Sequence, residues 1–404
     1  MKRKPLRLVH SRFSAAPALV GYLYQCRYAL VESLWRLRKS DEFVVSIEML
    51  DDVAFESDGE PLELFQIKHH INQVADLTNA STDLWKTIRI WCEGRADGSI
   101  PDGSSFFLVT TALAGEDSVA YYLKSGAHRN VPKAVERLNT TAASSANQEN
   151  KSAYAAFGAL GQAEKLSLAT AILVLDRAPV INDLDAALKK AIHFAASPQY
   201  LDSFLQRLEG WWLRRTIQHL VRPNLKPVLS EELEAEMGRL REQFKQDSLP
   251  VDNDIMNASV DASGYQDRMF VHQLQLIEVG NAHIFHAIRN YFRAFEQRSR
   301  WIREDLLLVG ELDGYEDRLV EEWDIRFQQM RDELGDAAAE EAKMLAAQAL
   351  YKWVETEAHQ PIRREVIEPA IARGTYQMLA DLPKVGWHAE FAERLKELLE
   401  VQEA

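Results

Sequence analysis

Three short β-rich segments near the front of the chain constrain its fold more than any other feature. Phe43–Glu48, Asp52–Glu56 and Leu62–His69 carry β-branched and aromatic residues, which favour strands. The turn signal Asp58-Gly59-Glu60-Pro61 separates the last two segments, and it predicts that they form a hairpin. The front of the chain is therefore predicted to be built on a β-sheet.

Helical and strand segments surround this hairpin in an order that indicates the fold class. Apolar residues recur at three- and four-residue steps over Gly21–Ser40 and Ala80–Gly94, which predicts a helix on either side of the hairpin. The continuous apolar run of Ser105–Thr111 predicts a buried strand. Tyr121–Gln162 has the composition of short helices and loops, and Ala171–Leu175 is short enough to be either strand or helix. This order predicts an α/β domain whose mixed sheet is flanked by helices.

The rear of the chain has a helical pattern instead. Tyr200–Val221 is strongly helical, and Pro223 and Pro227 then punctuate the chain. Long helices are predicted beyond this point at Glu231–Phe244, Leu274–Arg303, Glu316–Leu334 and Ala337–Thr356, with an irregular stretch at Leu379–Glu390 and a last helix running to the end. A chain of 404 residues is too long for one ordinary core. We therefore predict one domain over residues 1–222 and a mainly α-helical domain over residues 223–404.

Net charge divides the chain at the same place. The whole chain carries −14, but residues 1–222 hold 26 lysines and arginines against 25 aspartates and glutamates, a balance of +1. The remaining 21 basic and 36 acidic residues give residues 223–404 a balance of −15. This asymmetry suggests that the two parts have different partners, although a rear half of solvated helices is the simpler alternative.

Cysteine usage and hydropathy indicate the compartment. Cys26 and Cys92 are too few for a disulfide framework and form no zinc-binding pattern. The basic segment Met1–Phe13 is followed by no apolar run of signal-peptide length, and no segment is apolar for long enough to span a membrane. These features predict a cytoplasmic protein with no membrane partner.

Polar side chains share one face of the predicted hairpin. Successive strand residues alternate between the two faces of a sheet. Asp52 therefore faces away from the apolar Val53, and Gln66 and Lys68 face away from the apolar Ile67. If the apolar residues face the core, then Asp52, Gln66 and Lys68 converge on the opposite side.

This combination of side chains suits metal-dependent hydrolysis. Mg²⁺ prefers hard oxygen ligands, which the Asp52 carboxylate, the Gln66 side-chain carbonyl and the Ile67 backbone carbonyl can supply. Lys68 can hold the attacking water and neutralise the charge that grows on a phosphate. Asp52, Gln66 and Lys68 are therefore the predicted catalytic residues of an enzyme that cuts nucleic acid with Mg²⁺ or Mn²⁺. The competing structural interpretation is that the Asp-Asp pair caps a turn and that Gln-x-Lys carries no function.

The arrangement resembles the restriction-endonuclease-like superfamily, whose PD-(D/E)xK motif is an acid, a variable gap and then Asp/Glu-x-Lys. The chain differs in having Gln66 where the commoner form has a glutamate, and an uncharged ligand holds a metal less tightly. A further carboxylate is therefore expected as a metal ligand, and Glu48, Asp51 and Glu32 are the candidates. Glu32 shares a helix stripe with Gln25, and the resemblance implies that helix-borne acids can serve as ligands.

Basic residues outside the motif are candidates for DNA contact. Five of them lie in the first twelve positions: Lys2, Arg3, Lys4, Arg7 and Arg12. This arm can grip a phosphate backbone electrostatically, or it can be a solubilising tail. His69 follows the catalytic lysine and can contact phosphate, with a solvated strand end as the alternative.

Longer likenesses cover most of the chain. The resemblance to the nuclease domain of CD-NTase-associated bacterial defence effectors lies in Gly21-Tyr22-Leu23-Tyr24-Gln25, Ile47-Glu48, Asp51-Asp52, Gln66-Ile67-Lys68-His69 and Phe107-Leu108-Val109-Thr110-Thr111. A similarity to the C-terminal domain of ABC three-component defence proteins lies in Asp247–Asp252, Tyr291–Arg298, Asp313–Glu316 and Val385–His388. The nuclease effector subunit of Lamassu antiphage systems joins those two parts.

This resemblance implies a function and a set of partners. It implies a DNA endonuclease whose helical C-terminal domain serves partner docking or oligomerisation. The substrate would be double-stranded DNA, and the partners an SMC-like ATPase subunit and a small accessory subunit. The nuclease would be silent in that complex and become active through release and self-association into a homo-oligomer. The alternative is a non-catalytic subunit that binds DNA or protein in the same kind of complex.

Overall fold

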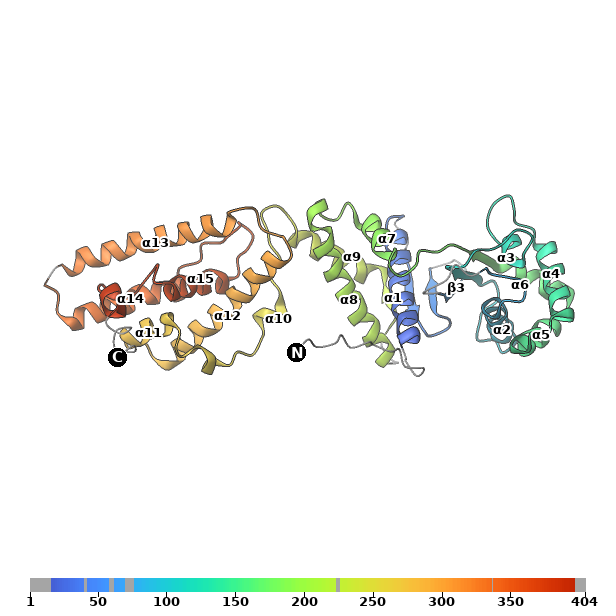
Figure 1. Ribbon diagram of the computed structural model, residues 1–404, viewed down its shortest axis with the longest axis horizontal. Coiled ribbons are helices and arrows are strands. Elements are labelled where there is room, and N and C mark those ends of the chain that lie inside the picture. The colour runs from blue at the N-terminus through green and yellow to red at the C-terminus, as the bar shows by residue number, and fades with distance from the viewer. Residues whose placement is uncertain are drawn as a thin grey trace, which may run out of the picture. The chain divides into compact units, whose positions relative to one another are not determined.

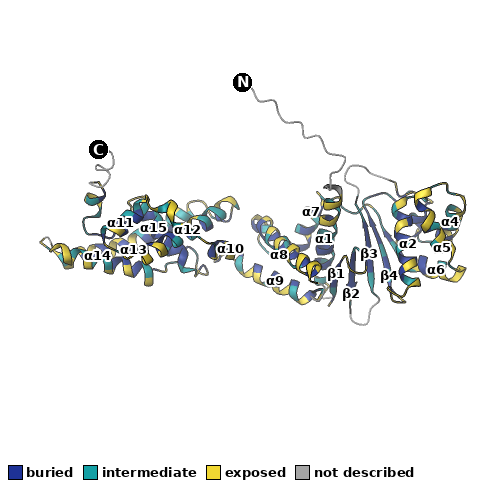
Figure 2. Cartoon of the chain, turned by 90° about the horizontal axis from the view of Figure 1, so that it is seen from below, coloured by how far each residue is buried: buried dark blue, intermediate teal, exposed yellow. Residues whose placement is uncertain are grey.

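A six-stranded sheet forms the centre of the N-terminal part of the chain in the computed structural model (Figure 2). Its strands are β1 (Val44–Ile47), β2 (Val53–Glu56), β3 (Glu63–Lys68), β4 (Ser105–Thr110), β5 (Ile172–Leu175) and β6 (Val228–Leu229). They lie in the order β5-β4-β3-β2-β1-β6. The β1–β2, β2–β3 and β1–β6 pairs are antiparallel, and the β3–β4 and β4–β5 pairs are parallel. The predicted mixed sheet is confirmed, including the strand whose type the sequence left open at Ile172–Leu175.

The sheet has two buried faces because its strands are apolar on both sides. On one face the rings of Phe43, Phe55, Phe65 and Phe107 follow one another across the sheet, with centroids 5.6, 5.6 and 4.5 Å apart. Helix α1 (Ala16–Leu37) reaches this face, since the Arg36 guanidinium lies 4.2 Å from the centroid of the Phe55 ring.

Helix α2 (Thr82–Ala96) packs on the opposite face. Its Trp91 ring stacks on Phe106 of β4 with centroids 4.8 Å apart, and Leu64 and Leu108 belong to the same buried cluster. In Figure 2 the strands, largely dark blue, lie between α1 and α2. The sheet is therefore the middle of three layers, as the predicted flanking helices require.

The chain up to Gln243 further contains α3 (Val119–Tyr122), α4 (Val131–Ser144), α5 (Lys151–Gly158), α6 (Gln162–Ala171), α7 (Leu184–Ile192), α8 (Leu201–Val221) and α9 (Ser230–Gln243), with 3₁₀ turns η1 (Gln148–Asn150) and η2 (Pro198–Tyr200). Helix α8 is tied to α1, because the Trp212 indole donates to the Cys26 carbonyl over 2.9 Å and Glu209 pairs with Arg27 at 2.6 Å.

The structure describes residues 16–39, 42–57, 62–69, 76–222, 226–335 and 337–396. The chain forms two compact units, and each unit is made of two separate stretches of sequence. The first unit combines the residues up to Ala195 with Phe204–Leu240, and the second combines Ala196–Ser203 with the residues from Arg241 onward. The first unit thus extends past the boundary that the sequence suggested at residue 222.

The second unit is helical (Figure 1). Its elements are α10 (Asn253–Met256), η3 (Ala262–Tyr265), α11 (Met269–Leu276), α12 (Asn281–Arg303), α13 (Glu311–Leu334), α14 (Glu340–Thr356) and α15 (Pro369–Asp381). The prediction of a single helix over Leu274–Arg303 is wrong, because helix α11 ends at Leu276 and a separate helix, α12, begins at Asn281. A mixed-sheet domain followed by a mainly helical region confirms the predicted fold class.

A close approach of two helices forms the centre of this unit. A Cβ atom built on Gly374 of α15 would lie 2.0 Å from the backbone oxygen of Asn290 on α12, so only glycine fits there. Loops are held by buried side chains: Gln297 and Trp301 both donate to the carbonyl of Pro250, over 3.1 and 2.7 Å. Among the described residues, no helix is both long and apolar enough to cross a membrane.

Candidate active site

The turn between β1 and β2 gathers three carboxylates at one end of the sheet. Ile47 pairs with Val53, and the Glu48 N–H donates to the Asp52 carbonyl over 3.1 Å, which closes the turn Glu48–Asp52. Glu48 has a φ of 56°, in the left-handed region that side-chain-bearing residues rarely adopt. Glu48, Asp51 and Asp52 are thereby brought to the end of the sheet toward which β3 runs.

Asp52 lies opposite Gln66 across the β2–β3 pair. The pairing of Val53 with Phe65 puts position 52 across from position 66. One carboxylate oxygen of Asp52 accepts the Ile67 N–H at 2.6 Å, and the other accepts the Gln66 side-chain amide at 3.3 Å. Asp52 is half-buried, so its carboxylate is both fixed and accessible.

Asp51 is the more enclosed acid, with 8% of its surface exposed. Its Oδ2 accepts the Trp91 indole N–H at 2.9 Å, and its Oδ1 accepts the Asp52 N–H at 3.0 Å and the Gln66 amide. Burial raises the pKa of Asp51 and the charge of Asp52 adds to this, while the hydrogen bonds from Gln66 and Trp91 oppose it. Burial and these hydrogen bonds suit Asp51 to orient the Gln66 amide.

The buried Gln66 is oriented by these acids. Because its Nε2 donates to Asp51 and Asp52, its Oε1 is turned away from them and accepts the Lys68 ammonium at 2.7 Å. Gln66 is only 4% exposed, whereas Lys68 is half-buried. The amide oxygen and the ammonium group therefore face the same accessible end of β3.

Helix α1 adds Gln25 and Cys26 to this end of the sheet. Burial and the charge of Asp52 raise the pKa of Glu48, while a hydrogen bond with Gln25 and the charge of Lys68 oppose the rise. Burial, followed by the charge of Glu48, raises the pKa of Cys26 to about 11. Glu48 therefore lies within electrostatic range of Asp52 and Lys68 and contacts Gln25.

The oxygen donors of this cluster are of the kind that a hard divalent cation binds. The charges of Asp52 and Asp51 add to the rise in the pKa of Glu48, and the charge of Asp52 adds to the rise in the pKa of Asp51. A bound cation relieves such repulsion. The oxygens of Asp52, Glu48 and Gln66 belong to the class of ligand that Mg²⁺ or Mn²⁺ prefers.

The structure brings most of the predicted site residues together, but not Glu32. Asp52, Gln66, Lys68 and the backbone of Ile67 are in contact, with Asp51 and Glu48 beside them. Glu32 instead pairs with Arg36 at 3.2 Å, and Arg36 also pairs with Glu63 at the beginning of β3. Lys68 lies five positions after Glu63 along β3, and the rise of a strand puts their Cα atoms roughly 16 Å apart. The structure therefore does not bring Glu32 to this cluster, because a shared helix stripe gives direction but not distance.

His69 lies at the end of β3, where its side chain takes part in packing. Its ring stacks on Tyr24 with centroids 4.3 Å apart, and its Nε2 accepts the Ile181 N–H at 3.2 Å. Tyr24 in turn donates to the Pro179 carbonyl over 2.7 Å. His69 thus fastens the end of β3 to α1 and to the segment around residue 180. The basic arm with Lys2, Arg3, Lys4, Arg7 and Arg12 lies outside the described residues.

Trp91 is the contact that the sequence did not point to. The helix stripe of α2 predicts a core position for it, and it is fully buried against Phe106. Its indole N–H nevertheless reaches Asp51. A buried tryptophan needs an acceptor for that N–H, and a nearby buried acid is one signal that would have linked the two.

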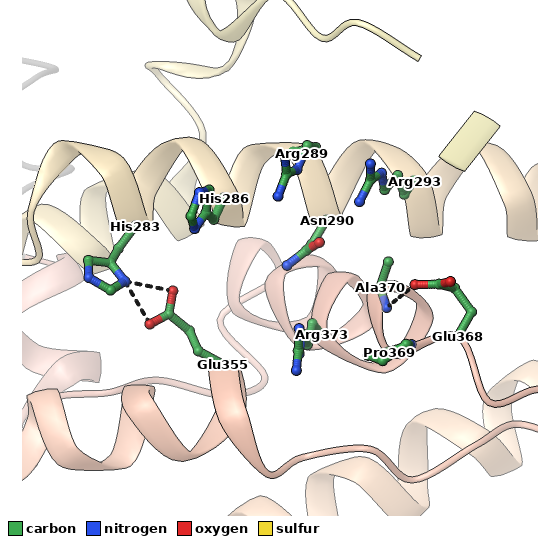
Figure 3. Close-up of a pocket in the computed structure, with 10 residues that line it drawn as sticks. All are labelled: His283, His286, Arg289, Asn290, Arg293, Glu355, Glu368, Pro369, Ala370 and Arg373. Carbon is green, nitrogen blue, oxygen red and sulfur yellow. Dashed lines mark hydrogen bonds and ion pairs between the residues drawn. The ribbon is translucent and has the colours of Figure 1, made fainter. Parts of the chain in front are cut away.

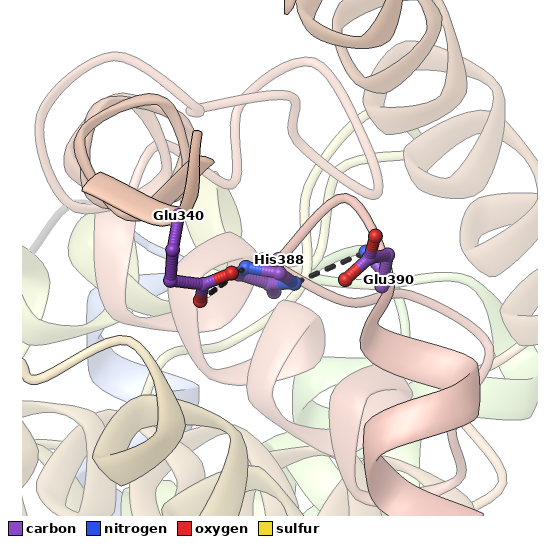
Figure 4. Close-up of side chains that lie close together, drawn as sticks. All are labelled: Glu340, His388 and Glu390. Atoms are coloured by element: carbon purple, nitrogen blue, oxygen red, sulfur yellow. Dashed lines mark hydrogen bonds and ion pairs between the residues drawn. The ribbon is translucent and has the colours of Figure 1, made fainter. Parts of the chain in front are cut away.

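A second group of potential metal ligands lies in the helical unit. Glu340, His388 and Glu390 place one ligand atom each within 4.8 Å of one another (Figure 4). The Glu390 N–H donates to His388 Nδ1 over 3.1 Å, so the ring proton is on Nε2, which lies 3.5 Å from Glu340. Arg394 pairs with both glutamates, and Lys343 pairs with Glu390. This group is a closed network of ion pairs, and a protonated Nε2 offers no lone pair to a metal.

Two family models match separate parts of the chain. Residues 16–100 match the model described as Cap4, dsDNA endonuclease domain, and this stretch contains the whole cluster around Gln66. Residues 270–395 match CTD7, the C-terminal domain 7 of the ABC-three component (ABC-3C) systems. The first match thus falls in the sheet-containing unit and the second in the helical unit.

Solved structures of Cap4 SAVED/CARF-domain containing receptors are similar at a low level. The receptor of Acinetobacter baumannii with the cyclic trinucleotide 3'3'3'-cAAA is 12% identical, with a TM-score of 0.34, over 69% of this chain and 66% of that chain. The receptor of Moraxella osloensis is 14% identical, with a TM-score of 0.34, over 70% of this chain and 69% of that chain. The chain thus spans just under two thirds of the length of the first receptor. No curated protein matches the chain.

Proposed function

We propose that the protein is a metal-dependent DNA endonuclease whose active site is formed by Asp52, Gln66 and Lys68. The observation that carries this proposal is the contact network at the end of β3, where Gln66 joins two carboxylates to one lysine. It lies inside the stretch that matches the Cap4 endonuclease domain and follows the acid, gap and x-Lys pattern of restriction-endonuclease-like enzymes.

In this proposal Asp52, Gln66 and Glu48 hold the cation, with the Ile67 carbonyl as a further donor. A bound Mg²⁺ or Mn²⁺ supplies Lewis acidity toward a phosphoryl oxygen and a water molecule. Lys68 holds the attacking water and offsets the negative charge that develops on the phosphate. Asp51 keeps the Gln66 amide turned so that its oxygen faces the substrate side.

We further propose that the protein is the nuclease effector of a Lamassu-type complex that cuts double-stranded DNA. The helical unit would dock on an SMC-like ATPase, a small accessory subunit would complete the complex, and release with self-association would activate the nuclease. The CTD7 match and the balance of −15 over residues 223–404 support a protein-binding role for this half, because phosphate backbones repel acidic surfaces. A pull-down in which residues 1–222 bind the ATPase and residues 223–404 do not would contradict these separate roles.

Nicking of a supercoiled plasmid tests the catalytic proposal. We expect cleavage that needs Mg²⁺ or Mn²⁺, stops with a chelator, and is abolished by Lys68→Ala and by Asp52→Ala. Lys86→Ala, on the exposed side of α2, removes an equal charge and serves as the matched control. The variants should melt within a few degrees of the parent, since both side chains are half-buried.

A non-catalytic binding subunit is the second candidate, because the neutral Gln66 contributes no charge to a metal site. No cleavage by the assembled complex with either metal would support this candidate. Cleavage retained by Lys68→Ala would also exclude the proposed site.

A further inference from the structure

A pocket of about 290 Å³ lies in the helical unit, between α12, α15 and the end of α14 (Figure 3). Arg289, Asn290 and Arg293 line it from α12, and Arg373 lines it from α15. Arg289 and Arg293 are four residues apart, so their side chains lie on the same face of the helix. The pocket thus gathers three guanidinium groups from two helices.

These three arginines lack the acidic partners that several neighbouring arginines of the unit have. Arg298 pairs with Glu316, Arg300 with Asp254 and Arg363 with Glu311. In the part of the chain that the structure describes, Arg289, Arg293 and Arg373 form neither an ion pair nor a hydrogen bond, and the Nε atom of each is buried without a partner. A buried donor that lacks an acceptor carries a desolvation cost, which a bound anion would remove.

The carboxylates of the pocket are already engaged at its two ends. Glu355 accepts a hydrogen bond from His283 at 2.8 Å, and Glu368 caps α15 by accepting the Ala370 N–H at 3.1 Å (Figure 3). Burial lowers the pKa of Arg293, the charge of Arg289 lowers it further, and Glu368 only partly opposes this. The repulsion between the arginines is therefore not cancelled within the protein.

The backbone under the pocket is rigid. Gly374 directly follows Arg373, and it lets α15 approach Asn290 so closely that a Cβ atom would lie 2.0 Å from the Asn290 carbonyl oxygen. The spacing of the two helix backbones that carry Arg289, Arg293 and Arg373 is consequently set before a ligand arrives. Preorganisation of this kind lowers the entropic cost of binding.

We propose that this pocket binds a small ligand carrying a compact, multiply charged phosphate group. Guanidinium groups match phosphate oxygens in pairs of hydrogen bonds, and three of them suit an anion with more than one charge. A DNA backbone presents single charges in an extended row, whereas this pocket is concave and lies in the acidic part of the chain. Its volume is close to the lower limit for small-molecule sites.

Calorimetric titration of the full chain with inorganic pyrophosphate tests the proposal. EDTA in the buffer keeps metal out of the experiment, so the outcome does not depend on the nuclease site. We expect Arg293→Gln and Arg373→Gln each to weaken binding about tenfold or more, the usual effect of losing a charged hydrogen bond. Arg303→Gln removes the same charge from the exposed end of α12 and should leave affinity unchanged.

A variant with the opposite expected sign makes the test sharper. Glu368→Gln keeps a side-chain oxygen to cap α15 but removes a negative charge beside Arg293, so it should tighten pyrophosphate binding severalfold. Pyrophosphate affinity that is absent, or equal in the parent, Arg293→Gln and Arg373→Gln, would overturn the proposal. The proposal would also be overturned if pyrophosphate does not bind but a DNA duplex without terminal phosphates does, and if that DNA binding is lost in Arg293→Gln and Arg373→Gln.

Discussion

Gln66 shows why a neutral residue can occupy the position where related motifs carry an acid. Its amide nitrogen donates to both Asp51 and Asp52, so it joins two carboxylates that would otherwise repel each other. An ionised glutamate at this position would have no proton to donate and would add a fourth carboxylate to Glu48, Asp51 and Asp52. In the proposed active site, the neighbouring Asp51-Asp52 pair thus accounts for a glutamine at position 66.

At the scale of single residues, Gln66→Glu is therefore expected to impair the protein although it restores the commoner motif. We expect a loss of about 1–3 kcal/mol in the free energy of unfolding, the cost of a broken buried hydrogen bond, together with reduced plasmid nicking. Urea denaturation and the nicking assay measure the two effects. Gln148→Glu, at an exposed position of the same unit, is the control. Faster cleavage by Gln66→Glu would contradict this account of the site.

Much of this cluster follows from the sequence, and the rest does not for identifiable reasons. Strand alternation placed Asp52, Gln66 and Lys68 on one face, because side-chain direction in a strand follows from position alone. The link from Trp91 to Asp51 depends on how α2 packs across the sheet, which periodicity does not encode. Glu32 does not join the cluster for a similar reason, since a helix stripe runs over several turns and the part of α1 around Gln25 and Cys26 is the part that reaches the site.

At the scale of elements, Gly374 controls how α12 and α15 pack. Gly374→Ala adds a methyl group 2.0 Å from a backbone oxygen and 2.5 Å from the Ala294 side chain, so the helices must separate. We expect a loss of about 1–3 kcal/mol in the free energy of unfolding. Thermal or urea melting measures it.

The same substitution elsewhere provides the control. Gly314 lies within α13, and no atom lies within 4 Å of the position that a Cβ would occupy there. Gly314→Ala should therefore stabilise the protein by about 0.5–1 kcal/mol, the ordinary helix preference of alanine. Equal effects of the two substitutions would mean that the close helix contact does not limit stability.

Ion pairs between helices make the stability of the second unit depend on pH. Burial alone would raise the pKa of Glu316, but hydrogen bonds from Arg298 and Lys384 outweigh it and hold its pKa below the usual value. The resulting stabilisation is present above the pKa of an unfolded glutamate, about 4.3, and is lost as the pH falls through the folded value. The melting temperatures of the parent and Glu316→Gln should thus differ most near neutral pH and converge as the pH falls below about 4. A difference that grows on acidification would exclude this pair as a source of stability.

Element prediction succeeded where one pattern dominated a segment. Alternating and continuous apolar runs located β1, β2, β3 and β4, whereas β6 has only two residues and no pattern of its own. Helix α15 was not predicted, because Pro383 and Gly386 indicate an irregular stretch, which overlaps the C-terminal end of this helix. Pro369 stands at the beginning of this helix, directly after its cap Glu368, and a proline at the first helical position is typical of helix starts.

At the scale of the whole molecule, the far end of the first unit completes its sheet. Strand β6 pairs with β1, the Ser230 N–H donates to the Phe43 carbonyl over 2.9 Å, and Arg215 pairs with Glu232 at 2.7 Å. Residues 1–222 lack these contacts and expose an unpaired edge at β1. We expect residues 1–240 to melt at a higher temperature and resist limited proteolysis longer than residues 1–222. Equal stability of the two fragments would show that β6 and α9 are dispensable.

The short segment Ala196–Ser203 belongs to the helical unit although residues of the first unit lie on both sides of it. Its Tyr200 packs against Phe244, with ring centroids 6.1 Å apart. A hybrid made by a single crossover would separate this piece from the helices it contacts. Exchange of the helical unit between related chains therefore has to transfer two stretches of sequence together. This holds in the laboratory and for recombination in nature, because the two stretches pack against each other.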